Sequence, residues 1–406
     1  MLTSRSLPLM SPRMHSGQMP LASTEEVPVI QPQQRAWLEI DREAISHNTA
    51  QICRSLKPGC SLMAVVKADG YGHGAVTVAE AATAGGATGF GVATLAEGIE
   101  LRQAGITAPV LVLGNLQQPE EFRCCLHWEL NPTISSLRQG LIASNVALAG
   151  GKPLGGHLKL DTGMARLGID WQEGAQLLEE LSKLDGLRLL GIYSHLADAD
   201  NPDGRITGEQ QERFEAVLRR CKELELRPGI RHLANSAGTL ADPSLHYDMV
   251  RVGLALYGHA PASHLNDAMA LKPALSVKAR VTLLRDVPAG VGISYGHQHI
   301  TQRPSRLAVL GIGYADGVSR RLSGHMEVLA NGQRLPQVGA ITMDQVVVDA
   351  TDLPELAIGD AVTLLGRSGD EEIRPSAWSE ICDTIPWEVL CSFKHRLPRL
   401  PVSTQH

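Results

Sequence analysis

The sequence lacks several features that would mark a specialised class of protein. No apolar stretch in its 406 residues approaches the roughly 20 residues that span a bilayer, and the net charge is −6 rather than basic. The chain therefore offers no basic face for nucleic acid or for an acidic membrane surface, and we expect neither as a partner. The 43% hydrophobic and 20% charged content is typical of an ordinary soluble globular protein.

Cysteine is sparse and has no pattern. The seven cysteines are an odd number without a C-x-x-C pair, and Cys124 and Cys125 are neighbours. This spacing suits neither a disulfide framework nor a zinc site, so no metal is expected. We interpret the cysteines as reduced packing residues of an intracellular protein, which favours a cytoplasmic location.

Residues 1–35 differ from the rest of the chain. They are rich in Ser, Pro, Met and Gln, and their first charged residues are basic. They lack hydrophobic periodicity and the long apolar core of a secretory signal. We expect a disordered extension, with a targeting segment as the alternative.

Strand-like and helix-like patterns alternate over residues 42–270. The candidate strands are eight short apolar runs: Leu62–Val66, Gly89–Ala93, Pro109–Leu113, Asn131–Ile134, His157–Leu160, Leu189–Ser194, Arg231–Ala234 and Met249–Val252. Amphipathic stretches lie between them, among them Ala75–Ala84, Leu95–Gln103, Trp171–Lys183 and Gly208–Leu224. Eight repeats predict an α/β fold of the (β/α)₈ barrel type, although an open doubly wound sheet shows the same alternation. No G-x-G-x-x-G follows an early strand, which argues against a dinucleotide fold.

The pattern changes over residues 271–403. Short alternating runs divided by Gly, Pro and Asn predict a small β domain there. The candidate strands are Leu275–Leu284, Leu307–Ile312, Met326–Val328, Gln337–Ile341, Gln345–Asp349 and Asp360–Leu365. Residues 36–41 contain one further strand, Trp37–Ile40, ahead of the barrel.

Lys67 ends an almost unbroken apolar run, Leu62–Val66, and a glycine-rich segment that must turn follows it. A lysine at the end of a buried strand is partly desolvated, which lowers its pKa and favours the neutral amine that attacks carbonyl groups. The alternative is a lysine that extends its ammonium group to water.

The segment Val66–Gly74, Val-Lys-Ala-Asp-Gly-Tyr-Gly-His-Gly, closely resembles the pyridoxal phosphate (PLP) lysine motif of alanine racemases. Matches to this family recur in order from about Trp37 to about Arg399. The resemblance implies that Lys67 binds PLP covalently and that Tyr71 contacts the phosphate. It also implies that the strand before the barrel pairs with the C-terminal sheet.

The next match is Lys159-Leu160-Asp161-Thr162-Gly163-Met164-Ala165-Arg166. From the residues alone, Lys159, Asp161 and Arg166 could form an ordinary ion-pair network. The resemblance instead implies that Arg166 binds the PLP phenolic oxygen or the substrate carboxylate. It further implies that Lys159 is a carbamate, so that one of two neighbouring cations becomes an anion.

Three further strand ends carry polar residues. A lone histidine such as His195 is more often structural than catalytic, and Ser236 could be a helix N-cap. Arg251, in an apolar strand, needs a partner. The resemblance places His195 against the cofactor ring, Ser236 on its phosphate and Arg251 at the pyridine nitrogen. It also assigns backbone N–H groups of Gly253 and Leu254 to the phosphate.

The β domain carries Tyr295, in Gly292–Gly296, and Met343, in Gly339–Gln345. Locally each motif reads as a turn between strands. The resemblance makes Tyr295 a catalytic base that acts in the other subunit of a homodimer, with Met343 close by. It places Gly313–Gly317 in the corridor by which substrate enters.

Two positions depart from the family pattern. Trp387 stands where the family often has a tyrosine that touches the phosphate, and indole is larger and donates a single hydrogen bond. Ala340 stands where many members have arginine. The first departure affects a phosphate contact and the second a contact in the substrate corridor.

The combined interpretation is a PLP-dependent alanine racemase that supplies D-alanine for peptidoglycan. Lys67 and Tyr295 would be the two bases, one on each face of the substrate Cα. The alternatives are a racemase of serine or a larger amino acid, a decarboxylase on the same barrel, and a non-enzymatic PLP carrier. Such carriers are single barrels, and this chain continues well beyond one.

Overall fold

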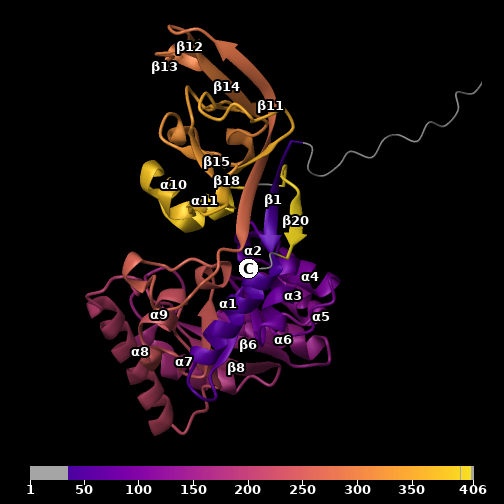
Figure 1. Cartoon of the computed structure of the whole chain (residues 1–406). Coiled ribbons are helices and arrows are strands. Elements are labelled where there is room, and N and C mark those ends of the chain that lie inside the picture. Colours follow the sequence, from indigo (N-terminus) through magenta and orange to yellow (C-terminus); the bar gives the residue numbers. More distant parts are fainter. Residues whose placement is uncertain (1–34, 394, 404–406) are drawn as a thin grey trace, which may run out of the picture.

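The computed structural model describes residues 35–393 and 395–403. The expectation for residues 1–35 therefore lies, except for Arg35, outside the described residues. A barrel surrounded by helices forms one half of the molecule, and a β-rich domain forms the other (Figure 1). Within the described part of the chain, no helix is both long and apolar enough to cross a membrane.

Eight parallel strands form a closed barrel in the order β2-β3-β4-β5-β6-β8-β9-β10, because β5 pairs with β6 and β10 with β2. The strands are β2 (Ser61–Val65), β3 (Gly89–Val92), β4 (Val110–Asn115), β5 (Asn131–Ile134), β6 (Leu154–Asp161), β8 (Leu187–Tyr193), β9 (Ile230–His232) and β10 (Met249–Val252). The short β7 (Ile169–Asp170) pairs with β6 outside this ring. The predicted barrel is confirmed, and each of the eight apolar runs overlaps one of its strands.

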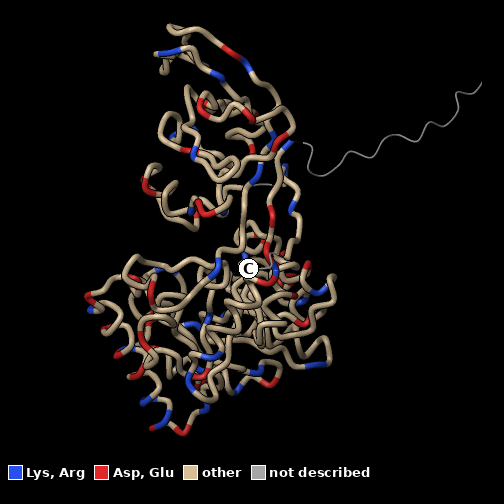
Figure 2. The backbone as a smooth tube through the Cα atoms, in the orientation of Figure 1, with Lys and Arg blue, Asp and Glu red and all other residues tan. Residues whose placement is uncertain are grey.

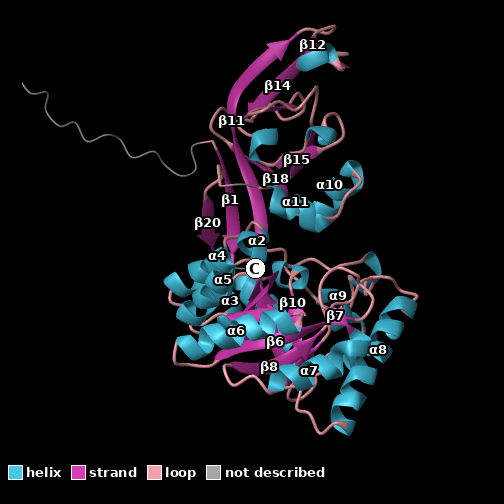
Figure 3. Cartoon of the chain, turned by 180° about the vertical axis from the view of Figure 1, so that it is seen from behind, coloured by secondary structure: helices cyan, strands magenta, loops and turns pink. Residues whose placement is uncertain are grey.

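Helices cover the outside of the barrel (Figure 3). They are α1 (Arg42–Ser55), α3 (Ala75–Ala84), α4 (Leu95–Gln103), α5 (Pro119–Trp128), α6 (Leu137–Ala149), α7 (Gly174–Ser182), α8 (Arg205–Glu223) and α9 (Ser236–Ala241). The start of α4 shows how the sequence sets these boundaries. The Thr94 hydroxyl accepts a hydrogen bond from the Glu97 amide, and the Glu97 carboxylate accepts one from the Thr94 amide, which forms a capping box.

The C-terminal sheet has the order β16-β15-β18-β11-β1-β20, and β14 links β11 to β17. Its strands are β1 (Ala36–Asp41), β11 (Leu275–Val287), β14 (Ser305–Leu310), β15 (Glu327–Ala330), β16 (Gln333–Pro336), β17 (Val346–Asp349), β18 (Ala361–Ser368), β19 (Glu371–Ile373) and β20 (Arg399–Val402). A separate hairpin joins β12 (Gly292–Ile293) to β13 (His299–Ile300). The first strand, β1, thus lies between β11 and the last strand, β20.

One expected strand of this domain is wrong. Gln337–Ile341 is not a strand, since only Gln337 forms an isolated bridge, with Val348. Gly339 interrupts the run with a left-handed φ of 71° that extended backbone does not allow. The predicted mostly-β character of the domain is confirmed, and two helices, α10 (Pro375–Cys382) and α11 (Pro386–Ser392), pack beside the sheet (Figure 1). Each helix begins with proline, which suits a first turn because its missing N–H has no partner there.

Charges of both signs are interspersed over the two domains (Figure 2). On α8, for example, Arg205 pairs with Glu209, and Arg220 pairs with Glu223. These pairs are exposed, and such pairs contribute about 0–1 kcal/mol each. They form a mixed solvated face, in keeping with the absence of a basic excess.

Candidate active site

A cavity of about 750 Å³ opens where the barrel strands end. Four cationic side chains line it: Lys67, Lys159, Arg166 and Arg251. The C-terminal domain closes part of it, with Ile385, Trp387, Glu388 and Cys391 among the lining residues. The C-terminal ends of the strands are where barrel enzymes carry their chemistry, so this cavity is the candidate active site.

Lys67 begins a turn with the wrong hand for L-amino acids. Along α2 (Lys67–Tyr71), φ is 54° at Ala68, 54° at Asp69 and 52° at Tyr71. Left-handed backbone costs roughly 1–2 kcal/mol at each such residue. The expected turn is present, but it is a left-handed one built largely from non-glycine residues.

Lys67 is mostly buried, and the structure supports the desolvation argument. Burial lowers the pKa of its ammonium group, and the positive charge of Arg166 lowers that pKa further. A larger fraction of Lys67 is therefore neutral at a given pH than in water, and the neutral amine is the form that acts as a nucleophile or base.

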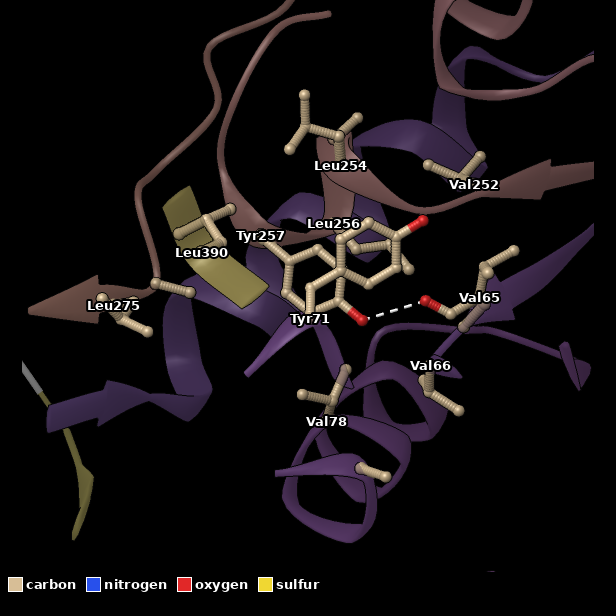
Figure 4. Packing of buried hydrophobic residues seen from close by; sticks show 14 of the residues in the cluster. Val65, Val66, Tyr71, Val78, Val252, Leu254, Leu256, Tyr257, Leu275 and Leu390 are labelled. Carbon is tan, nitrogen blue, oxygen red and sulfur yellow. Dashed lines mark hydrogen bonds between the residues drawn. The ribbon is translucent and has the colours of Figure 1, made fainter. Parts of the chain in front are cut away.

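Tyr71, the last residue of this turn, packs in an aromatic cluster with Tyr257 (Figure 4). Its ring centroid is 4.8 Å from that of Tyr257, and the ring of His73 lies 4.5 Å from Tyr257 on another side. The Tyr257 hydroxyl donates to the Val65 carbonyl at 2.9 Å. The cluster thus packs Tyr71 against the end of β2, the strand that precedes Lys67.

Ser236, Gly253 and Tyr71 converge on one end of the cavity. Ser236 Oγ accepts hydrogen bonds from the amides of Gly253 at 3.0 Å and Ala255 at 3.4 Å. The N-cap of α9 is Asn235, whose side chain accepts from the Gly238 amide, so the N-cap alternative for Ser236 is wrong. A Cβ on Gly253 would lie 2.5 Å from Tyr71 Oη, so only glycine leaves this approach open.

Arg251 is 4% exposed, and its contacts are carbonyl groups and histidines. It donates to the Ser194 carbonyl at 2.7 Å and to His195 Nδ1 at 3.1 Å. It also lies 3.3 Å from His232 Nδ1. Burial lowers the pKa of Arg251 to about 10, which still leaves it charged at neutral pH. The partner that its apolar strand required is therefore a set of neutral acceptors.

Lys159 is 6% exposed and lies with its Nζ 4.9 Å from the centre of the Tyr193 ring. Burial, followed by Arg251 and Arg166, lowers its pKa to about 7. Asp161 instead accepts the amides of Gly163, Met164 and Ala165. Within residues 35–393 and 395–403 no ion pair joins Lys159, Asp161 and Arg166, so the ordinary ion-pair alternative is wrong.

Tyr295 and Met343 lie outside this cavity. They are 70% and 53% exposed, and Tyr295 follows β12, at the end of the C-terminal domain farthest from the barrel (Figures 1 and 3). Ser294, with a φ of 60°, donates to the Ala340 carbonyl at 2.7 Å, which pins the turn that carries Tyr295. The Ala340 side chain itself is buried, so this departure leaves no side chain in solvent.

The structure also reveals site residues that sequence reasoning did not single out. Glu97 accepts the Ala68 amide at 2.7 Å and so fixes the residue after Lys67; its capping-box spacing from Thr94 was the available signal. Tyr193 stacks on His232 and lies under both Lys159 and Arg251. Its place at the end of an apolar run was the only indication.

Comparison with known proteins accounts for both halves of the chain. The model of the alanine racemase N-terminal domain matches residues 40–261. The model of the alanine racemase C-terminal domain matches residues 274–401. Alanine racemase of Prochlorococcus marinus is 56% identical over 92% of this chain and 97% of its own length. The alanine racemase of a Nostoc species is 54% identical over 91% and 96%.

Solved structures agree with the fold as well as with the sequence. The alanine racemase of Clostridium difficile superposes with a TM-score of 0.87 at 34% identity, over 92% of this chain and 97% of that one. That of Bartonella henselae, solved with covalently bound pyridoxal phosphate, gives 0.80 at 32% identity, over 91% and 99%. Both domains, their order and their nearly full-length coverage agree: the chain belongs to the alanine racemase family of amino-acid racemases.

Proposed function

We propose that this racemase interconverts L- and D-alanine with PLP held on Lys67. The observation that carries the proposal is the collection of Lys67, Lys159, Arg166 and Arg251 around one cavity at the strand ends. Basic side chains gathered in a partly buried cavity favour an anionic ligand, such as a phosphate together with a carboxylate.

The residues present fit PLP. Ser236, the amides of Gly253 and Leu254, and Tyr71 would hold the phosphate at the end of the cavity where Gly253, which has no Cβ, lets Tyr71 Oη approach closely. Arg251 and His195 would hold the ring, and Lys67 would hold the aldehyde carbon. Trp387 lines the cavity. Its indole would contact the phosphate in place of the smaller tyrosine often found in the family.

When bound, PLP withdraws electrons from the amino acid and makes its Cα proton removable. Lys67, with its lowered pKa, would take or return that proton on one face. Arg251 donates hydrogen bonds but does not readily release a proton. Arg251, held near the ring nitrogen, would therefore temper the electron withdrawal and disfavour transamination.

Arg166 would bind the substrate carboxylate, and Lys159 would orient Arg166 as a carbamate. A pKa of about 7 leaves a large share of Lys159 neutral near pH 7. A neutral amine can add to carbon dioxide, forming an N–C bond and releasing one proton, and the resulting anion relieves the crowding of cations.

The second base would be Tyr295 of a partner subunit, with Met343 beside it. Both side chains are exposed on the described chain, and neither lines its own cavity. A homodimer with shared sites would bring each Tyr295 to the other barrel. The Gly313–Gly317 segment, proposed to line the substrate corridor, lies beside the Met343 turn, since Tyr314 and Ala315 donate their amides to the carbonyls of Thr342 and Met343.

The wider setting of the enzyme is part of the same proposal. We assign residues 42–270 to the cofactor domain and residues 271–403 to the β domain. The seven cysteines have neither C-x-x-C pairs nor the spacing of a disulfide framework, which supports a reducing, cytoplasmic location. There the enzyme would supply D-alanine for peptidoglycan.

The test is direct. Purified protein supplied with PLP should interconvert L- and D-alanine, and it should act on serine or larger amino acids much more slowly. Release of carbon dioxide would reveal a decarboxylase. PLP binding without turnover of any amino acid would reveal a carrier, which the matched C-terminal domain does not favour.

A further inference from the structure

We infer that Arg399, on the last strand of the chain, is a positioning residue that holds the left-handed turn after Lys67 in its functional shape. The inference deepens the proposed function and rests on it, because it assumes that Lys67 holds PLP. Arg399 lies outside the cavity and would act only through the turn.

Arg399 contacts the turn at two points. Its Nη2 forms an ion pair with Asp69 Oδ2 at 3.0 Å. Its Nε donates to the Gly72 carbonyl at 2.8 Å. The two contacts lie three residues apart on the turn, so one guanidinium group spans it from Asp69 to Gly72.

The same guanidinium is anchored in the C-terminal domain. Its Nη1 and Nη2 lie 3.4 Å from the carbonyls of Leu397 and Phe393 respectively. The backbone of α11 also lies against the turn, since a Cβ on Gly72 would meet the Leu390 carbonyl at 2.5 Å. Arg399 therefore joins the segment between α11 and β20 to the cofactor turn.

The turn has a second anchor on its opposite end. Glu97 accepts the Ala68 amide at 2.7 Å through Oε1, and the Ala93 amide at 2.7 Å through Oε2. Asp69 Oδ1 meanwhile accepts the Ala75 amide at 2.9 Å, which ties the turn to α3. Glu97, on α4 of the barrel domain, fixes the start of the turn, and Arg399 fixes its end from the other domain.

Such anchoring matters because the turn opposes its own backbone preference. Ala68, Asp69 and Tyr71 all have positive φ, a conformation that persists only where surrounding contacts enforce it. Lys67 precedes these residues and Tyr71 is one of them. Relaxation of the turn would therefore move the covalent anchor and a phosphate contact relative to each other.

The chemistry of the contact requires arginine. A guanidinium presents donors in two directions at once, here toward a carboxylate and a carbonyl, whereas a lysine ammonium is a single point charge. Arg399→Lys should therefore keep an attraction to Asp69 and lose the bond to the Gly72 carbonyl. Arg399→Gln loses the ion pair.

The experiment compares wild type, Arg399→Lys, Arg399→Gln, Asp69→Asn and the double variant Arg399→Gln/Asp69→Asn. Arg334→Gln serves as the control, because it breaks ion pairs with Glu327 and Glu371 inside the β domain without touching the turn. Amide hydrogen exchange of residues 68–74 is measured before and after addition of PLP. The PLP dissociation constant and the kcat and KM for alanine are measured on the same samples.

We expect faster exchange confined to the turn in Arg399→Gln, and weaker PLP binding by about 10- to 100-fold, the scale of a misplaced binding group. Arg399→Lys should fall between Arg399→Gln and wild type. The double variant should lose less than the product of the two single losses, since both remove one contact. Arg334→Gln should behave as wild type.

Unchanged exchange in the turn of a folded Arg399→Gln or Arg399→Lys variant would overturn the inference. So would faster exchange spread evenly over both domains, because that pattern describes a general tie rather than a positioning residue. Failure of wild type to bind PLP would instead refute the proposed function, and the exchange data before PLP addition would still show whether Arg399 holds the turn.

Discussion

Arg251 donates from Nη2 to Nδ1 of His195 across 3.1 Å. A guanidinium has no acceptor, so His195 must accept at Nδ1 and carry its own proton on Nε2. Burial, followed by the charge of Arg251, holds the pKa of His195 well below its usual value, so the ring is neutral. His232 also accepts from Arg251, and its Nε2 is left to donate to His157 Nδ1 at 3.0 Å. Neutral imidazoles thus hold the charged group in place without a carboxylate.

Lys67 is expected to be the single point of covalent PLP attachment. Borohydride reduction of the PLP-loaded enzyme, followed by peptide mapping, should find the cofactor on Lys67, because burial and Arg166 both favour its neutral amine. Lys67→Ala should lose the attachment and racemisation in both directions. Labelling of Lys159 or another lysine instead would contradict the assignment.

Activity is expected to require two subunits. Lys67→Ala and Tyr295→Phe chains should each be inactive alone, and mixing them should restore part of the activity. One of the two sites in a mixed dimer would then carry both native bases. The readout is alanine racemisation after subunit exchange has been verified. A mixture that exchanges subunits and stays inactive would count against a shared site.

Tyr295→Phe is expected to act on one face of the substrate. Solvent deuterium should still exchange with the Cα proton of one alanine enantiomer, while exchange of the other falls by roughly 10²–10⁴-fold, the usual contribution of a positioned acid or base. The PLP absorbance should be unchanged, because Lys67 is intact. Mild and equal slowing for both enantiomers would point to a packing role for Tyr295.

Carbamylation of Lys159 is expected to follow pH. At constant dissolved carbon dioxide, the carbamate should increase as pH rises through about 7, where the buried amine loses its proton. Carbon NMR with isotope-labelled bicarbonate measures it, and Lys159→Met is the control that should show no signal. The unfolded chain keeps this proton up to pH 10.5. The free energy of unfolding, relative to Lys159→Met, should therefore rise between about pH 7 and 10.5 in the absence of carbon dioxide.

Gly253→Ala is expected to weaken PLP binding. Gly253 has a φ of −116° and a ψ of −92°, outside the main allowed regions of L-residues, and its Cβ would lie 2.5 Å from Tyr71 Oη. Overpacking costs about 1–3 kcal/mol, so PLP should bind about 10- to 100-fold more weakly. Gly208→Ala, in α8 with no atom near the new Cβ, is the matched control. It should bind PLP normally and gain about 1 kcal/mol in stability. Equal PLP affinity in both variants would show that the Tyr71 approach is not part of the site.

The sequence predicted the barrel because buried parallel strands read as apolar runs bounded by turns. It could not predict the hand of the turn after Lys67, since Ala68, Asp69 and Tyr71 have no local preference for positive φ. Gln337–Ile341 had the alternation of a strand, yet Gly339 breaks the extended backbone there. Local pattern reports which faces are apolar and leaves out the long-range contacts that impose rare backbone conformations.

The candidate site was partly predictable from the barrel itself. The residues at the strand ends meet because parallel strands in a barrel end at one rim. Two alternatives could be excluded only from the structure: that Ser236 is an N-cap and that Lys159 belongs to an ion-pair network. Each depends on which amide or carboxylate lies within reach of the side chain. The roles of Tyr295 and Met343 depend on a second subunit and stay predictions.

The position of β1 between β11 and β20 bears on the order of events during synthesis. The barrel strands β2 to β10 are all made before β11, so the barrel can close while the ribosome is still producing the C-terminal domain. Strand β1 is made first, yet its neighbours are among the later strands, and Arg399 reaches back 327 residues to Gly72. A nascent or truncated chain would thus hold a closed barrel with an unpaired leading strand, an edge that invites pairing with other chains. The residues of β20 are needed both to pair with β1 and to supply the contacts of Arg399 with the turn after Lys67.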